Sequence, residues 1–196
     1  MSAMKPNPDP SAAWLEVART RDPVFLDERR RMLDLLVQHP DCLERTSRPG
    51  HFTGSALIVD PSTATILLLF HTKLQLWLQP GGHADGDGNL AHVAWREATE
   101  ETGIEGLRVV QRPIDLDIHR VDPPAEDAHL HFDVRYLVVA PPGAQPSGNH
   151  ESEALRWVDL TEFDELVPDD NTRRMARRAL HRLRTHGLTD ARSSER

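Results

Sequence analysis

The sequence predicts an α/β domain in which a mixed sheet lies between layers of helices. Strand candidates alternate with two major helices along most of the chain, and this alternation is typical of such layered architectures. One candidate, residues 66–70, is an almost continuous apolar run, as expected for a strand buried on both faces. Turn-forming residues separate the strand candidates from one another.

Length and composition limit the number of domains, the partners and the location that the protein can have. The chain has 196 residues, 38% of them hydrophobic, so one domain can bury a core. A net charge of −8 disfavours nucleic acid or an anionic membrane as the main partner. The single cysteine, Cys42, is interpreted as a buried thiol. No apolar run approaches the ~20 residues of a membrane span, and residues 1–11 resemble no signal peptide, so a cytoplasmic location is expected.

Residues 1–50 are predicted to be a helical extension, after a disordered lead at 1–10. Ser11 can cap a short helix, and a second helix should begin at Asp22-Pro23, with proline in its first turn, and end before Pro40. Its apolar residues are Leu33, Leu35, Leu36 and Val37. The extension could cover a sheet edge, support a homodimer or shape a pocket.

The strand candidates that follow are residues 52–59, 66–71, 76–79, 107–111, 114–121, 130–140 and 155–158. Asp60-Pro61-Ser62-Thr63 between the first two is strong turn chemistry. A final helix, capped by Asp169, Asp170 or Asn171, carries arginines that helical spacing should spread over a solvated surface. Residues 187–196 are expected to be a flexible tail.

The chain is organised around residues 81–104. The glycine-rich part, from Gly81 to Gly88, predicts an irregular loop with positive-φ positions. A helix should follow, because Asn89 can cap it and Gly103 suits the left-handed position after its last turn. Its apolar stripe consists of Leu90, Ala91, Ala94 and Ala98.

Three glutamates, Glu97, Glu100 and Glu101, lie on one turn of this helix. Like charges at this spacing repel, and a hard cation such as Mg²⁺ would offset the repulsion. The alternative interpretation is a solvated acidic face.

The stretch resembles the Nudix box, G-x5-E-x7-R-E-U-x-E-E-x-G-U with U apolar, the signature of the Nudix hydrolase family. The match falls on Gly82, Arg96, Glu97, Ala98, Glu100, Glu101, Gly103 and Ile104, and residues 77–82 resemble the usual lead-in. Gly88 stands where the pattern has its first glutamate. Asp85 and Asp87 lie close enough to substitute in part, which leaves the number of bound metals open.

The resemblance implies a Nudix-type α/β/α sandwich over residues 51–186. It also implies a metal-dependent hydrolase that cleaves a diphosphate linkage in a nucleoside diphosphate derivative or nucleotide. Mg²⁺, with Mn²⁺ as an alternative, would be held by Glu97, Glu100, Glu101 and the Gly81 carbonyl. Glu97 is assigned to catalysis, with Glu101 or the loop residue Glu151 as general base.

Two further strand candidates place ionisable groups on one face. Period two aligns His129, His131, Asp133 and Arg135, and separately Asp115, Asp117 and His119. They are interpreted as a cleft wall that binds a small diphosphate substrate, with the Arg135 fork on a phosphate. His83, after the glycine pair, is a further candidate. The alternative is a half-solvated sheet surface.

Two other functions remain open from the sequence. Gly88 favours a Nudix-fold protein that binds a nucleotide-like ligand without cleaving it, as a sensor or regulator. Alternatively, His129, His131 and His119 could be the centre of a transition-metal enzyme containing zinc or iron.

Overall fold

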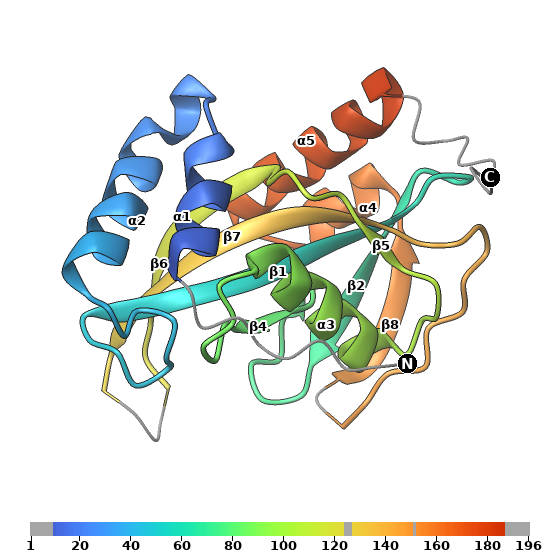
Figure 1. Cartoon of the computed structure of the whole chain (residues 1–196). Coiled ribbons are helices and arrows are strands. Elements are labelled where there is room, and N and C mark those ends of the chain that lie inside the picture. Colours follow the sequence, from blue (N-terminus) through green and yellow to red (C-terminus); the bar gives the residue numbers. More distant parts are fainter. Residues whose placement is uncertain (1–9, 124–126, 151, 187–196) are drawn as a thin grey trace.

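The computed structural model describes residues 10–123, 127–150 and 152–186, and it contains a mixed sheet with helices on both faces (Figure 1). The two long central strands, β1 (Gly50–Asp60) and β7 (His129–Val139), run parallel to each other from the Gly50–Leu130 pair to Val59–Val139. The other described pairings of the sheet are antiparallel.

Each central strand is paired with different neighbours at its two ends. Along β1, Thr53–Ser55 pair with β4 (Gly81–His83), whereas Val59 and Asp60 pair with β2 (Thr65–His71). Along β7, β6 (Asp115–Val121) covers the beginning and β5 (Arg108–Val109) the end. β2 also pairs with β3 (Trp77–Leu78) and β8 (Ser152–Val158). On each side of the β1–β7 pair, the neighbouring strand therefore changes along the length of the pair.

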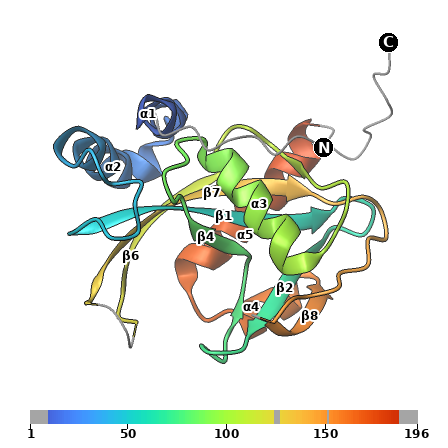
Figure 2. The same ribbon diagram turned by 60° about the horizontal axis from the view of Figure 1, so that its bottom comes forward.

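The helices form two layers, each with its own apolar core (Figure 2). On one face, α1 (Pro10–Arg19), α2 (Leu26–Gln38) and α3 (Leu90–Thr102) cover alternate β1 residues such as Phe52, Ala56 and Ile58. On the other face, α4 (Leu160–Leu166) and α5 (Asp170–His186) cover Leu57 and Val59. The expected α/β/α sandwich is confirmed.

The N-terminal helices lie beside α3 and share its core through Ala13, Val17, Met32 and Leu35 (Figure 1). The Asp22 carboxylate caps a short 3-10 helix, η1 (Pro23–Phe25), that precedes α2. The expected apolar face of α2 was wrong at Val37, which is 75% exposed, because Met32 is buried instead. Helical periodicity alone could not choose between these two residues.

Most predicted elements are present with ends that differ by a few residues. The glycine-rich stretch is an exception, because Gly81–His83 pairs with β1 instead of forming only loop. The short helix α4 was not expected; the Asp159 carboxylate caps it by accepting the Glu162 N–H. Cys42 is buried and unpaired with any other cysteine, as expected. Residues 1–9, 187–196 and Glu151 lie outside the described residues. No described helix has both the length and the apolarity to cross a membrane.

Candidate active site

The glycine loop lies directly against the carboxylates of α3. The Gly81 N–H donates to the Glu101 carboxylate at 3.1 Å. A Cβ on Gly82 would lie 2.5 Å from Glu97 Cδ, so only glycine leaves room for the Glu97 carboxylate there. The loop then turns through positive φ at Asp85 (48°) and Gly86 (82°), as the sequence predicted.

Local signals fix both ends of α3. The Asn89 side chain accepts the His92 N–H at 3.1 Å, and Gly103 closes the helix with φ of 62°. Gly54 on β1 lets the helix approach closely, since a Cβ there would lie 2.8 Å from the Leu90 carbonyl oxygen. The helix is thereby held across β1 with its glutamates beside the loop.

The three glutamates differ in their surroundings. Glu101 is buried, with 6% of its surface exposed, Glu97 is half-buried and Glu100 is exposed. The Arg96 guanidinium donates to the Glu97 carboxylate at 2.6 Å and to the His83 carbonyl at 2.8 Å. Arg96 therefore orients Glu97 and ties it to the end of β4.

These residues provide the oxygen donors that a hard divalent cation prefers. The Glu97 carboxylate lies against Gly82, and the Glu101 carboxylate accepts the Gly81 N–H. Both carboxylates are therefore next to the backbone segment that carries the Gly81 carbonyl. Glu100 is one helical turn away from Glu97 and would have to rotate towards them. The donor set fits Mg²⁺ or Mn²⁺.

The aspartates near Gly88 are already engaged. Asp87 is 2% exposed; it accepts the Asn89 N–H and contacts the His92 ring at 2.6 Å. Asp85 accepts Arg45 Nε at 2.8 Å. Both carboxylates hold the loop in place in this conformation, and the expectation that either could replace the missing glutamate in part stays a prediction.

A cavity of about 620 Å³ lies in front of the glycine loop, between the diverging strands. Its lining includes Gly81, Gly82 and Glu101 together with six of the residues predicted to form the substrate wall: His83, Asp117, His119, His131, Asp133 and Arg135. The predicted residues His129 and Asp115 are not among its lining residues. Further residues of β1, β2, β3, β6 and the start of α5 also line it. Strand period and register thus bring these distant segments to one cavity.

Arg135 has carboxylate partners that the sequence did not predict. Its side chain is 3% exposed, donates to Asp133 at 2.7 Å and to Asp117 at 2.8 Å, and lies 3.5 Å from Asp115. Carboxylates surround the guanidinium in this geometry, and the prediction that its fork binds a phosphate stays a prediction. Burial raises the pKa of Asp115 to about 6, even though Arg135 and Arg174 oppose the shift.

Asp133 is a buried residue in the lining of this cavity. Its carboxylate accepts Ser55 Oγ at 2.8 Å and Thr53 Oγ1 at 3.0 Å from the neighbouring strand β1, as well as Arg135. A buried charge with this many hydrogen bonds is fixed in position. Asp133 therefore orients Arg135 and the hydroxyl groups of Ser55 and Thr53. This role depends on strand register and could not be predicted from the sequence.

Glu16 was not singled out from the sequence. This α1 carboxyl accepts the Ala91 N–H of α3 at 3.2 Å and hydrogen-bonds the buried Tyr136 hydroxyl of β7. Burial raises its pKa to about 7. A glutamate on the apolar side of an amphipathic helix was the available signal.

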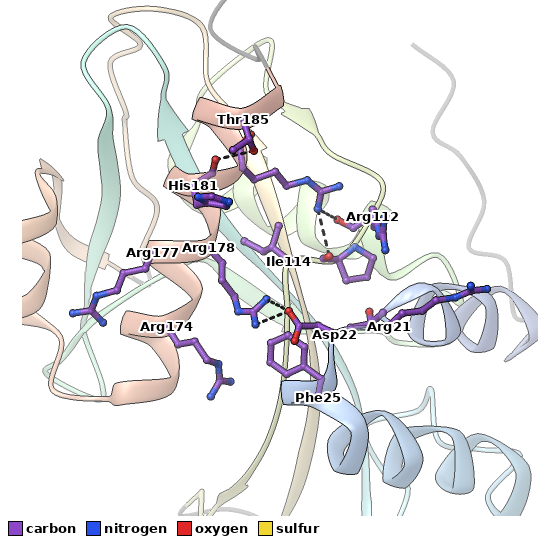
Figure 3. A pocket seen from close by; sticks show the side chains of 13 residues that line it. Arg21, Asp22, Phe25, Arg112, Ile114, Arg174, Arg177, Arg178, His181 and Thr185 are labelled. Carbon is purple, nitrogen blue, oxygen red and sulfur yellow. Dashed lines mark hydrogen bonds and ion pairs between the residues drawn. The ribbon is translucent and has the colours of Figure 1, made fainter.

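A second cavity, of about 660 Å³, lies between η1, residues 112–114 and α5 (Figure 3). Four of the six α5 arginines, Arg174, Arg177, Arg178 and Arg182, line this cavity, whereas Arg173 and Arg184 do not, so helical spacing distributes the arginines less evenly than expected. Several are neutralised by described carboxylates: Arg174 by Asp115, Arg177 by Asp164 and Arg178 by Asp22. This cavity does not include the glycine loop or the α3 glutamates.

Fold and site together define an α/β/α protein with a carboxylate helix behind a glycine loop. The NUDIX domain model matches residues 51–181, and the chain belongs to the Nudix family. Family membership supports hydrolysis of pyrophosphate bonds in general terms. No curated protein matches the chain at a significant level.

Solved structures show the same fold. A C. elegans Ap4A hydrolase binary complex is similar with a TM-score of 0.57 and 17% identity over 68% of this chain and 97% of that one. The E. coli dihydroneopterin triphosphate pyrophosphohydrolase gives 0.55 and 18% over 68% and 96%. The NUDIX domain of Shewanella oneidensis NrtR complexed with ADP ribose gives 0.52 and 16% over 67% and 87%.

Proposed function

We propose that the protein is a divalent-metal-dependent hydrolase that cleaves a diphosphate linkage in a nucleoside diphosphate derivative or nucleotide. The observation that supports this most directly is the placement of Glu97 and Glu101 against Gly82 and Gly81, beside a cavity of about 620 Å³. The substrate class follows from the family together with a carboxylate site that needs a cation to accept a polyanion.

Glu97, Glu101, Glu100 and the Gly81 carbonyl would hold Mg²⁺ or Mn²⁺. The bound cation supplies Lewis acidity at a phosphoryl oxygen and lowers the pKa of a coordinated water. Arg96 keeps Glu97 in a ligating orientation, and the Gly81 amide does the same for Glu101. His83 and His131 line the cavity where the phosphates would lie.

The proton of the attacking water needs an acceptor, and Glu101 or Glu151 is the general base in this proposal. Glu101 is buried next to the loop, which keeps its carboxylate close to the cavity. Glu151 directly precedes β8 in the sequence and lies outside the described residues.

The test is a panel of diphosphate compounds assayed with Mg²⁺ and with Mn²⁺. Ap4A and ADP-ribose are suitable members, since the names of structures with a similar fold include these compounds, and nucleoside triphosphates extend the panel to the nucleotides of the proposed substrate class. We expect hydrolysis of at least one compound, lost on chelation. Glu97→Gln and Glu101→Gln should each lower kcat by roughly 10²-fold or more, whereas the exposed Glu105→Gln should match wild type.

Ligand binding without cleavage is the second candidate. It is favoured by Gly88 and by the engagement of Asp85 and Asp87 in structural contacts, which leaves the motif one carboxylate short. Calorimetric binding of a panel member with no turnover under either metal would support this sensor role and overturn the hydrolase proposal.

A further inference from the structure

Histidine side chains gather where β1, β4, β6 and β7 meet. His51 and His131 are cross-strand partners, as are His119 and His131. The His51 ring centroid lies 4.9 Å from that of His131, 4.8 Å from that of His129 and 5.0 Å from that of His83. Such convergence of imidazoles from separate strands offers several nitrogen ligands to one point.

Three of these rings are close enough to share an ion. Potential ligand nitrogens of His51, His129 and His131 all lie within 4.8 Å of one another, and no other described group of three His, Cys, Asp or Glu side chains satisfies this condition. In a tetrahedral zinc site the ligand nitrogens are roughly 3.4 Å apart, given bonds of about 2.1 Å. Small side-chain rotations would bring the three nitrogens to that spacing.

His51 shows that this cluster is not an ordinary hydrogen-bonded core. Its side chain is 0% exposed, and neither ring nitrogen makes a hydrogen bond of normal geometry within the described residues. A buried polar group without a hydrogen-bond partner destabilises the fold, because it has lost its contacts with water and gained none in return. By contrast, His92 and His119 each contact an aspartate carboxylate, at 2.6 and 2.9 Å. The Ser47 backbone approaches the His51 ring without a hydrogen bond of normal geometry, so a metal ion would give a ring nitrogen of His51 a stronger partner.

His129 is already in the tautomer that a metal needs. Its Nδ1 lies 2.7 Å from the Asp127 carbonyl oxygen, which only accepts, so Nδ1 carries the proton and donates it. In the neutral ring this leaves the Nε2 lone pair for a ligand. Metal-binding histidines are commonly oriented by such a carbonyl contact.

The electrostatic setting favours uncharged rings. Burial lowers the pKa of His51 to about 4, with the neighbouring His83 and His129 adding to the shift. Burial, followed by the neighbouring His51 and His119 rings, also lowers the pKa of His131.

We propose that His51, His129 and His131 form a site for one transition-metal ion of the Zn²⁺ class, distinct from the hard-cation site at Glu97 and Glu101. Imidazole nitrogens select zinc, copper, nickel or iron over magnesium, whereas the glutamates and the Gly81 carbonyl have the opposite preference. His83, 5.0 Å from His51 and 5.3 Å from His131 between ring centroids, is the nearest further ring for a fourth position.

This arrangement differs from the histidine site expected from the sequence. His119 was expected to join His129 and His131, but its Nδ1 is taken by Asp117 at 2.9 Å and its ring lies beside His131 only. The third ligand comes instead from His51, at the start of β1. The parallel pairing of β1 with β7 creates the site, and sequence spacing could not reveal that pairing.

The test uses the full chain stripped with a chelator and then titrated with Zn²⁺ against a chromophoric competitor. We expect about one Zn²⁺ per chain with Kd below roughly 1 µM, and a Co²⁺ derivative with the intense visible bands of a four-coordinate nitrogen site. If the wild-type chain binds well below one equivalent of Zn²⁺, the proposal is overturned, and no variant is needed for that conclusion.

Variants locate the ion. His129→Gln and His131→Asn should each weaken Zn²⁺ binding by at least about tenfold, whereas the exposed His181→Ala on α5 should bind as wild type. Glu97→Gln should also retain Zn²⁺, because the two sites use different ligands. Unchanged affinity in folded His129→Gln, or lost Zn²⁺ in Glu97→Gln, would contradict the assignment. These outcomes do not depend on whether the protein cleaves a diphosphate.

Discussion

At the scale of single residues, the site depends on how closely backbone and carboxylate approach each other. Gly82 and Glu97 are the clearest case, because a Cβ on Gly82 would lie 2.5–2.7 Å from Glu97 carboxylate atoms. Glycine is needed at this position because it leaves space for the Glu97 carboxylate, and not because the backbone has a positive φ. The family motif includes a glycine and a glutamate at these positions, and the close approach of Gly82 to the Glu97 carboxylate explains why glycine is needed in this chain.

Gly82→Ala is therefore predicted to displace the Glu97 carboxylate while the fold is kept. Because Glu97 is half-buried and ends in a flexible side chain, it can move, so we expect only a small loss of stability. The Mg²⁺ concentration for half-maximal activity should rise by roughly tenfold or more. Metal-dependent kinetics, with thermal unfolding as the check on folding, measures both effects. An unchanged metal requirement would contradict this role for Gly82.

Residue-level prediction from sequence succeeded where the determinants are local. The Asn89 cap and the left-handed Gly103 depend on neighbours within a few residues, and both are present. Arg135 is the opposite case, since its partners Asp115 and Asp117 come from β6 through strand register. A fork suited to phosphate is equally suited to carboxylate, and only the register decides which one it meets.

At the scale of elements, Glu16 connects three of them. It lies on α1, accepts the first-turn Ala91 N–H of α3 and hydrogen-bonds Tyr136 on β7. Since α3 carries the motif glutamates, the N-terminal helices help to hold the site. Sequence periodicity could predict these helices but could not place them, because their position depends on side chains packed against a distant face.

The raised pKa of Glu16 makes stability depend on pH. The folded carboxyl keeps its proton up to about pH 7, while the unfolded chain releases it near 4.5, so the contribution of the neutral form is complete below about 4.5 and is lost as pH rises through 7. Glu16→Gln keeps an acceptor without the charge. It should stabilise the protein by roughly 1–3 kcal/mol at pH 8 and by much less at pH 5.

Denaturant unfolding at both pH values measures this difference, with Glu105→Gln as the exposed control. Asp115, whose pKa burial raises to about 6, contributes in the same direction but is present in both proteins and cancels in the comparison. If the difference in unfolding free energy between wild type and Glu16→Gln stays constant from pH 5 to 8, the pKa of Glu16 is not raised by folding and the prediction is wrong.

At the scale of the whole molecule, the two helical layers are separated by the sheet, and α5 of one layer contacts η1 of the other through Asp22 and Phe25. Fold class was predictable because alternating strands and helices leave few arrangements. The contact between the layers was not, since it joins residues more than a hundred positions apart. Phe25 of η1 belongs to the core of α1, α2 and α3, and it also lies under two arginines of α5 (Figure 3).

Phe25→Ala is predicted to destabilise the whole fold. The ring is buried, with the Arg178 guanidinium 4.4 Å and that of Arg174 5.2 Å from its centroid. Truncation removes both the core volume and the cation–π contacts, so we expect a loss of about 3–5 kcal/mol. Phe25→Leu keeps much of the apolar volume and should lose only about 1–2 kcal/mol.

Urea unfolding followed by tryptophan fluorescence and by circular dichroism measures both variants. If Phe25 couples the layers, the two probes should coincide in wild type and Phe25→Leu, because the molecule then unfolds as one cooperative unit. Phe25→Ala should shift the midpoint of both probes together, in proportion to its larger loss. A loss below about 1 kcal/mol, or a change in one probe alone, would show that the N-terminal helices and α5 are stabilised independently across the sheet edge.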